Sequence, residues 1–207
     1  MEILHAGYLA DLMKAIKVGV VPSREQFHEL VGLGPLFKTD KHGRILVTLT
    51  GTGWMGAEWL ARSDAGEFGL TKWARDVLAQ PDYDAEHRLE PGKQHTVALM
   101  FGKKEFPADA DRTTANLQAR GERDYGKSDD LRGELALLLR ELISDEQLGH
   151  WGIRYIAVLH EPIVDSDGDP DILAMDCRGD GRRVSAYCGD PDVYWHFAGA
   201  FAVPVSQ

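Results

Sequence analysis

The sequence predicts an α+β fold: a single domain in which the helices of the N-terminal three-quarters pack on a mainly antiparallel sheet. Apolar residues recur with a helical period through most of residues 1–150, whereas from residue 152 onward they alternate with a period of two. Helices and strands in separate blocks are typical of this class, because a parallel sheet needs them to alternate. We therefore predict one domain over residues 1–207, with a helical region 1–150 and a C-terminal four-strand antiparallel meander over 152–205.

Local signals place the individual elements. Capping boxes, in which a serine and a glutamine three residues later satisfy each other's backbone, open helices at Ser23 and Ser144, and Ser128 with the two following aspartates caps the leucine-rich helix between them. The predicted helices cover residues 9–16, 23–31, 54–60, 70–78, 111–123, 131–142 and 144–150. Runs rich in β-branched residues, or with alternating polarity, predict strands over residues 44–50, 95–101, 154–164, 171–177, 182–188 and 193–203.

Composition indicates a chain that needs neither a metal nor a disulfide to fold. Its 207 residues are 43% hydrophobic and 27% charged, and a chain of this length buries roughly two-thirds of its unfolded surface. The formal net charge of −10 opposes binding to nucleic acid, which requires a basic surface. Local basic clusters do occur, at Arg178, Arg182 and Arg183 and at Lys103 and Lys104.

The sequence favours a cytoplasmic location without a membrane partner. No stretch approaches the roughly 20 apolar residues that span a bilayer, and the N-terminus has no signal-type apolar run. Cys177 and Cys188 lie on predicted strands joined by a tight turn, several residue pairs apart, whereas a disulfide needs Cα atoms within about 7 Å. We therefore expect two reduced thiols, as is usual in the cytoplasm.

An acidic turn separates two of the predicted strands. Its carboxylates are Asp165, Asp167, Asp169 and Asp171, and Asp176 follows five residues later, which matches the ligand positions 1, 3, 5, 7 and 12 of a calcium loop. A proline replaces the usual glycine of that loop, however, and Asp176 is shorter than the usual glutamate. Two interpretations remain open: a Ca²⁺ or Mg²⁺ site on Asp165, Asp167, Asp169 and Asp176, or a solvated turn built from ordinary turn residues.

A GxGxxG pattern, Gly51, Gly53 and Gly56, lies between a predicted strand and a predicted helix. In dinucleotide-binding folds such a loop brings backbone amides close to a pyrophosphate. No further strand ending in a carboxylate follows here, and glycines before a helix also serve simply to turn the chain. Nucleotide or phosphate binding and a plain turn are therefore both open.

Two scattered sets of residues complete the candidates. Cysteine and histidine on neighbouring strands can form a nucleophile and its base, and the residues of this kind are His95, His160, Glu161, Cys177, Cys188 and His196. Trp195, Phe197, Phe201 and Val203 alternate along one strand, and the helices of residues 54–78 carry matching tryptophans at 54, 59 and 73. We predict that these helices bury the aromatic sheet face, with a ligand groove or a partner surface, which would also include Tyr194, as the alternative.

Four segments carry a resemblance to known sequences: His160–Pro170, Gly199–Gln207, Asp111–Asn116 and Thr50–Gly53. Through these segments the chain resembles a group of uncharacterised bacterial proteins over most of residues 45–207. The resemblance implies a bacterial origin, and it carries over no activity and no functional residue.

No catalytic motif stands out, so the sequence favours a non-catalytic binding or interaction protein over an enzyme. An edge strand or the aromatic face would contact a small ligand or a protein partner. The alternatives are a metal-dependent hydrolase or calcium-binding domain using the turn Asp165–Asp171, and a nucleotide- or phosphate-binding enzyme using Gly51–Gly56.

Overall fold

The computed structural model describes residues 37–127, 130–178 and 181–205. Contacts divide the chain into two units, Met1–Lys38 and Thr39–Gln207, and nearly all of the described residues belong to the second. The helices predicted over residues 9–16 and 23–31 and the cap predicted at Ser128 lie outside the described residues.

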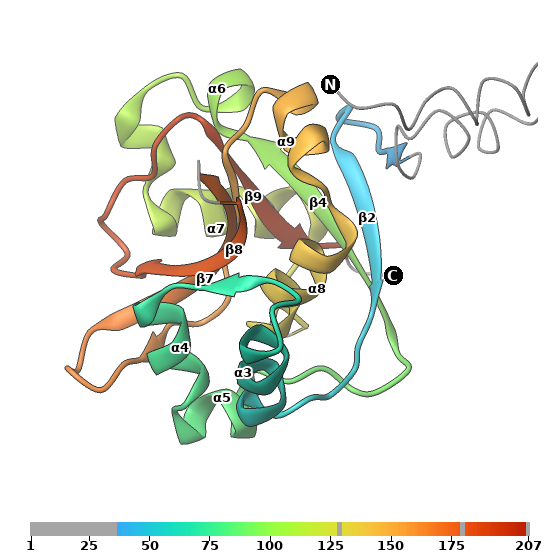
Figure 1. Cartoon of the computed structure of the whole chain (residues 1–207). Helices are drawn as coiled ribbons and strands as arrows, with labels where there is room; N and C mark the ends of the chain where they lie inside the picture. The colour runs from blue at the N-terminus through green and yellow to red at the C-terminus, as the bar shows by residue number, and fades with distance from the viewer. Residues whose placement is uncertain (1–36, 128–129, 179–180, 206–207) are drawn as a thin grey trace, which may run out of the picture. The chain divides into compact units, whose positions relative to one another are not determined.

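The described residues form seven α-helices, a short 3₁₀ helix and nine strands (Figure 1), which confirms the predicted α+β class. The helices are α3 (Gly56–Asp64), α4 (Lys72–Leu78), α5 (Pro81–Glu86), α6 (Gly102–Glu105), η1 (Asp109–Arg112), α7 (Thr114–Tyr125), α8 (Glu134–Leu142) and α9 (Asp145–Trp151). The strands are β1 (Lys38–Thr39), β2 (Ile45–Thr50), β3 (Gly69–Leu70), β4 (Gln94–Phe101), β5 (Tyr155–Val158), β6 (Ile163–Val164), β7 (Pro170–Arg178), β8 (Gly181–Cys188) and β9 (Gly199–Pro204). The capping box at Ser144 is present at the start of α9.

One mixed, mostly antiparallel sheet organises the fold, in the order β1-β2-β4-β9-β5-β7-β8-β3, with β6 paired to β7. β5, β7 and β8 are antiparallel neighbours, as expected for the C-terminal meander. The last strand differs from a simple meander because β9 lies between β4 and β5 and runs parallel to β5. A parallel pairing needs a crossover, and residues 189–198 supply it.

Helices cover both faces of the sheet. Leu117 of α7 and Phe106 pack with Met100, Phe201 and Val203 on one face, while α8 contacts β2, β5, β7 and β8. Figure 1 shows α8 and α9 on the near side of the sheet and α7 behind it.

α8 is buried around its whole circumference over Glu134–Arg140, including both charged ends of that run. The leucine-rich helix predicted over residues 131–142 is present, but it begins at Glu134, and Leu142 at its end is exposed. Its two buried charges, Glu134 and Arg140, require internal partners.

Candidate functional site

Hydrogen bonds within the acidic turn itself hold it closed. Asp165 Oδ1 accepts hydrogen bonds from the amides of Asp167 and Asp169, both at 2.9 Å, and the Asp165 amide donates to the Asp169 carbonyl at 2.9 Å. Gly168 adopts a φ of +92°, which a glycine takes without strain. One of the predicted metal ligands, Asp165, is therefore the acceptor that holds the turn together.

Asp176 lies apart from the turn. It lies five positions beyond Asp171 along the extended strand β7, a distance of about 16 Å. Its carboxylate accepts from Arg183 Nε at 2.7 Å, Ser185 Oγ at 2.9 Å and Tyr187 OH at 2.7 Å. The structure thus separates Asp176 from Asp165, and within the described ranges no three His, Cys, Asp or Glu side chains are arranged to hold a metal ion.

Asp171 and Asp76 are carboxylates near the turn that our set of predicted ligands omitted. Burial, together with the negative charges of Asp165, Asp169 and Asp76, raises the pKa of Asp171 to about 6. Asp76 of α4 accepts from the Ser166 amide at 3.0 Å and from its hydroxyl at 2.7 Å. α4 is therefore joined to the acidic turn across 90 residues of sequence, which no local pattern could indicate.

The glycine loop surrounds a carboxylate of the protein itself. Glu134 Oε1 accepts from the Thr52 amide at 2.8 Å, the Thr52 hydroxyl at 2.6 Å and the Gly53 amide at 3.0 Å. Glu134 Oε2 accepts from the Leu89 amide at 2.6 Å. Glu134, at the buried end of α8, is thus the anion at the position that a phosphate would take in a nucleotide-binding loop.

The rest of the loop is also occupied. The Trp54 amide donates to Thr52 Oγ1 at 3.3 Å. The Met55 amide donates to Glu58 Oε2 at 2.7 Å, and the Gly56 amide donates to Asp84 Oδ1 at 2.8 Å. Close packing accounts for the glycines: a Cβ on Gly51 would lie 2.6 Å from the Glu90 carbonyl oxygen, and one on Gly56 would lie 1.8 Å from the Leu78 carbonyl oxygen. A phosphate could reach this backbone only by displacing internal carboxylates.

The histidine and cysteine candidates are dispersed. His160 is fully engaged: its Nδ1 donates to the Glu161 carbonyl at 2.6 Å and its Nε2 accepts from the Leu173 amide at 3.0 Å. Burial and the neighbouring His87, whose ring centroid is 4.9 Å away, lower the pKa of His160 to about 3. Cys177 lies opposite Arg182 and Cys188 opposite Asp171, so the two thiols are at opposite ends of the β7–β8 pair.

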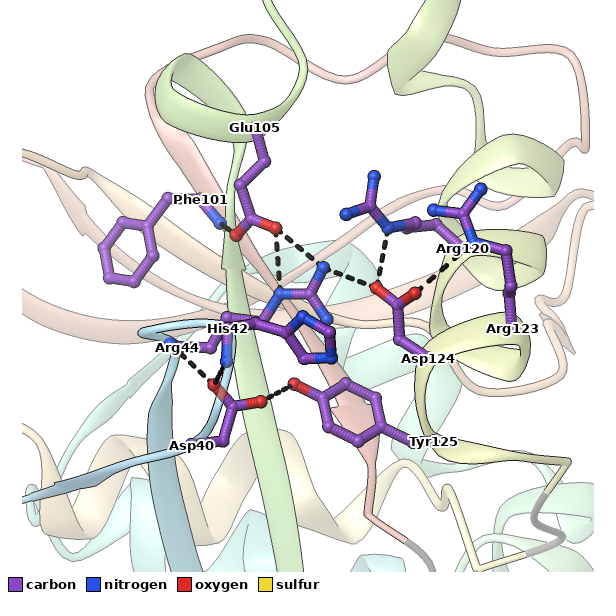
Figure 2. Close-up of polar contacts among 9 residues, drawn as sticks. All are labelled: Asp40, His42, Arg44, Phe101, Glu105, Arg120, Arg123, Asp124 and Tyr125. Carbon is purple, nitrogen blue, oxygen red and sulfur yellow. Dashed lines mark hydrogen bonds and ion pairs between the residues drawn. The ribbon is translucent and has the colours of Figure 1, made fainter.

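Figure 2 shows a buried ionic network that the sequence did not indicate. Arg44, which is 1% exposed, donates to Glu105 at 2.8 Å and to Asp124 at 2.7 Å, and Tyr125 donates to Asp40. Burial raises the pKa of Asp124, but the bonds from Arg120 and Arg44 outweigh it, so that this pKa lies well below its usual range. Every charge here has a protein partner, and the network joins the start of β2 to α6 and α7.

The aromatic residues form two clusters where we predicted one. Trp59 packs against Trp54 and Phe68, with ring centroids 4.8 and 6.1 Å away. Trp195 and Phe201 belong instead to the cluster on the α7 face of the sheet. The prediction that the helices of residues 54–78 cover Trp195 and Phe201 is therefore wrong, because the crossover at residues 189–198 and α7 take that place. Trp73, Tyr194 and Phe197 are exposed.

A pocket with an aromatic wall lies beside the second cluster. Tyr155, Tyr187 and Trp195 form its wall, with ring centroids 5.9–6.1 Å apart. The pocket has a volume of about 770 Å³, and its lining also includes Asp176, Arg154, His196, Tyr194, Val193 and the two cysteines. Pairing β5 with β7 and β7 with β8 places Tyr155, Asp176 and Arg183 side by side.

The fold and the pocket together define an α+β protein with an aromatic-walled cavity. No family model matches the chain, and neither a curated protein nor a solved structure is similar to it. Among the residues that the structure describes, no helix has the length and apolar character needed to cross a membrane.

Proposed function

We propose that this chain is a non-catalytic binding protein that holds a small planar ligand in the aromatic pocket. The observation that carries the proposal is the wall of Tyr155, Tyr187 and Trp195 beside a volume of about 770 Å³. Small-molecule sites typically enclose about 300–1,000 Å³ and combine aromatic walls with a few polar groups. Offset ring stacking adds affinity beyond the burial of apolar area.

The chemistry of the lining supports binding over catalysis. Asp176 already accepts three hydrogen bonds, and the Tyr155 hydroxyl donates to the His196 carbonyl at 2.7 Å. Burial, with the nearby Asp145 charge, raises the pKa of the Cys177 thiol, which lowers its thiolate fraction. These groups are used to build the pocket, and a thiol with a raised pKa is a weak nucleophile.

A fragment titration tests the proposal. Indole, quinoline and 2-naphthol are added separately to ¹⁵N-labelled protein, and amide shifts are recorded. We expect dissociation constants below about 1 mM and shifts concentrated at Tyr155, Tyr187 and Trp195. Shifts that are absent, or that are spread evenly over the surface, would contradict the proposal.

A matched pair of variants locates the binding. Val193 lines the pocket and is 39% exposed, whereas Val164 is 47% exposed on β6 and does not line it. Val193→Trp should fill the pocket and weaken fragment binding about tenfold or more, because the side chain competes for the same wall. Val164→Trp should leave the affinity unchanged, and equal effects of the two variants would refute this location.

The cytoplasm remains the location that we propose. Cys177 and Cys188 are both free, and the β7–β8 register holds them six residue pairs apart. Reduced thiols persist in that compartment. Fractionation of the source cells with a tagged chain tests it, and recovery from an oxidising compartment would contradict it.

A further inference from the structure

We infer that the ligand of the aromatic pocket is an aromatic acid, whose planar ring packs on the Tyr155–Trp195 wall and whose anionic group is attracted by Arg154. This inference rests on the proposed function and names the chemical class of the ligand. It follows from the charges of the side chains around the pocket.

The carboxylate in the pocket lining is not available to a ligand cation. Asp176 is 1% exposed and accepts from Arg183, Ser185 and Tyr187. Its negative charge is therefore compensated by the ion pair with Arg183, at 2.7 Å. A cationic ligand would have to break bonds that already satisfy these oxygens, which is costly for a buried charge.

Arg154 is in the opposite situation. It lines the pocket immediately before β5 and is exposed. Its backbone bonds to Ala198 and Cys177, but its guanidinium makes no hydrogen bond or ion pair with any residue in the described ranges. None of the residues that the structure describes neutralises its positive charge, and a guanidinium pairs well with a carboxylate.

Other arginines that lie near aromatic rings provide the contrast. Arg44 lies over Tyr125 and pairs with Glu105 and Asp124. Arg62 lies over Trp54 and pairs with Glu67 and Glu141. In both of those clusters the protein supplies its own anions, whereas at the pocket a ligand would supply the anion for Arg154.

One further group favours an anion. His196 Nδ1 accepts from the Ala198 amide at 3.1 Å, so the neutral ring carries its proton on Nε2 and keeps a donor at the exposed rim. Arg112 adds no free positive charge beside the wall, because it is ion-paired with Asp109.

The test uses three probes that share one ring: indole-3-acetate, 3-methylindole and tryptamine. Calorimetric titration into the full chain at low salt should give an affinity for the acid about 5- to 10-fold above that for the neutral compound, with the amine weakest. The preference for the acid should fall as NaCl is raised from about 0.05 to 0.5 M, because an exposed pair is screened. Arg154→Gln should remove the preference and leave the affinity for 3-methylindole unchanged.

Arg75→Gln is the matched control, since it removes one positive charge from α4, where Arg75 pairs with Asp64 outside the pocket. It should preserve the preference for the acid. If the neutral probe binds but the acid does not bind more tightly, or if Arg154→Gln keeps the preference, this inference fails while the proposed function stands. If none of the three probes binds, the proposed function fails as well.

Discussion

Replacing Glu134 by glutamine should destabilise the protein more than its modest change in size suggests. The carboxylate accepts four hydrogen bonds, three on Oε1 and one on Oε2. Hydrogen bonds to a charged group contribute about 1.5–3 kcal/mol each, against about 1 kcal/mol for a neutral pair. A glutamine that keeps its oxygen toward Thr52 and Gly53 turns its amide group toward the Leu89 N–H, which then has no acceptor.

We expect a loss of about 3–5 kcal/mol from the weakened bonds and the orphaned donor together. For a chain of this length that corresponds to a fall of about 6–20 °C in Tm. Urea unfolding at pH 7 gives the free energy of unfolding, and hydrogen exchange at Thr52, Gly53 and Leu89 reports the amides directly. Glu122→Gln, at an exposed glutamate of α7, serves as the control and should change stability by less than about 0.5 kcal/mol.

A loss below about 1 kcal/mol for Glu134→Gln, with unchanged exchange at those amides, would refute the reasoning. It would mean that the loop does not depend on the carboxylate for its hydrogen bonds. The same geometry leads to a second prediction. Because internal acceptors already bind the loop amides, millimolar phosphate, ADP or NAD should leave Tm unchanged.

Three other predictions follow from buried contacts. Folding raises the pKa of Asp171 from about 3.8 to about 6, so the free energy of unfolding should fall as pH rises from about 4 to about 6. Asp171→Asn should remove this pH dependence and gain about 1–3 kcal/mol at pH 7, whereas Asp167→Asn, at an exposed position, should not. An unchanged pH dependence of urea unfolding in Asp171→Asn would contradict this prediction. Gly56→Ala would bring a Cβ to 1.8 Å from a backbone oxygen and should lower the free energy of unfolding by about 3 kcal/mol or more. Gly149→Ala in α9, where a Cβ meets open space, should raise it by about 0.5–1 kcal/mol. Equal effects of the two variants in thermal melts would be inconsistent with the packing. Arg44→Met leaves Glu105 without its cation, while Asp124 keeps its ion pairs with Arg120 and Arg123. The substitution should cost about 3 kcal/mol, and calorimetry that shows no loss would argue against the network of Figure 2.

The fold class was predictable because it depends on local periodicity. Strands β2, β4, β7 and β8 lie within one or two residues of their predicted bounds, and so does α9 with its capping box. The helix expected over residues 70–78 begins at Lys72 instead, because Gly69 and Leu70 pair in parallel with β8. That pairing is a tertiary contact, and a helical period cannot indicate it.

The path of β9 illustrates the same limit at larger scale. Alternating aromatic residues over 193–203 predicted one continuous strand, yet only Gly199–Pro204 pairs as a strand. The preceding residues cross the face of the sheet and bury Trp195, whose indole donates to the Thr114 hydroxyl at 3.0 Å. An alternating pattern shows that side chains have two environments, but it does not show which strand lies alongside.

The pocket could not be predicted because its wall comes from three separate segments. Trp195 was singled out as aromatic, but Tyr155 and Tyr187 read as ordinary strand residues, and only the β5–β7–β8 register brings them together. Asp176 shows the consequence most directly. In the sequence it looked like the last ligand of the acidic turn, and in the structure the extended strand carries it to the pocket, where Arg183, Ser185 and Tyr187 surround it.

The glycine loop explains why a phosphate-binding pattern can arise without a phosphate. Gly51 and Gly56 are required because backbone oxygens approach within 3 Å of where a Cβ would lie, and the turn points the adjacent amides of Thr52 and Gly53 toward one acceptor. Such a group of amides needs an acceptor whether or not a ligand exists. Here Glu134, at the start of a helix buried on all sides, is held inside the fold with no access to water. The carboxylate and the loop therefore satisfy each other, and a pattern associated with ligand binding in other folds serves here to attach α8 to the end of β2.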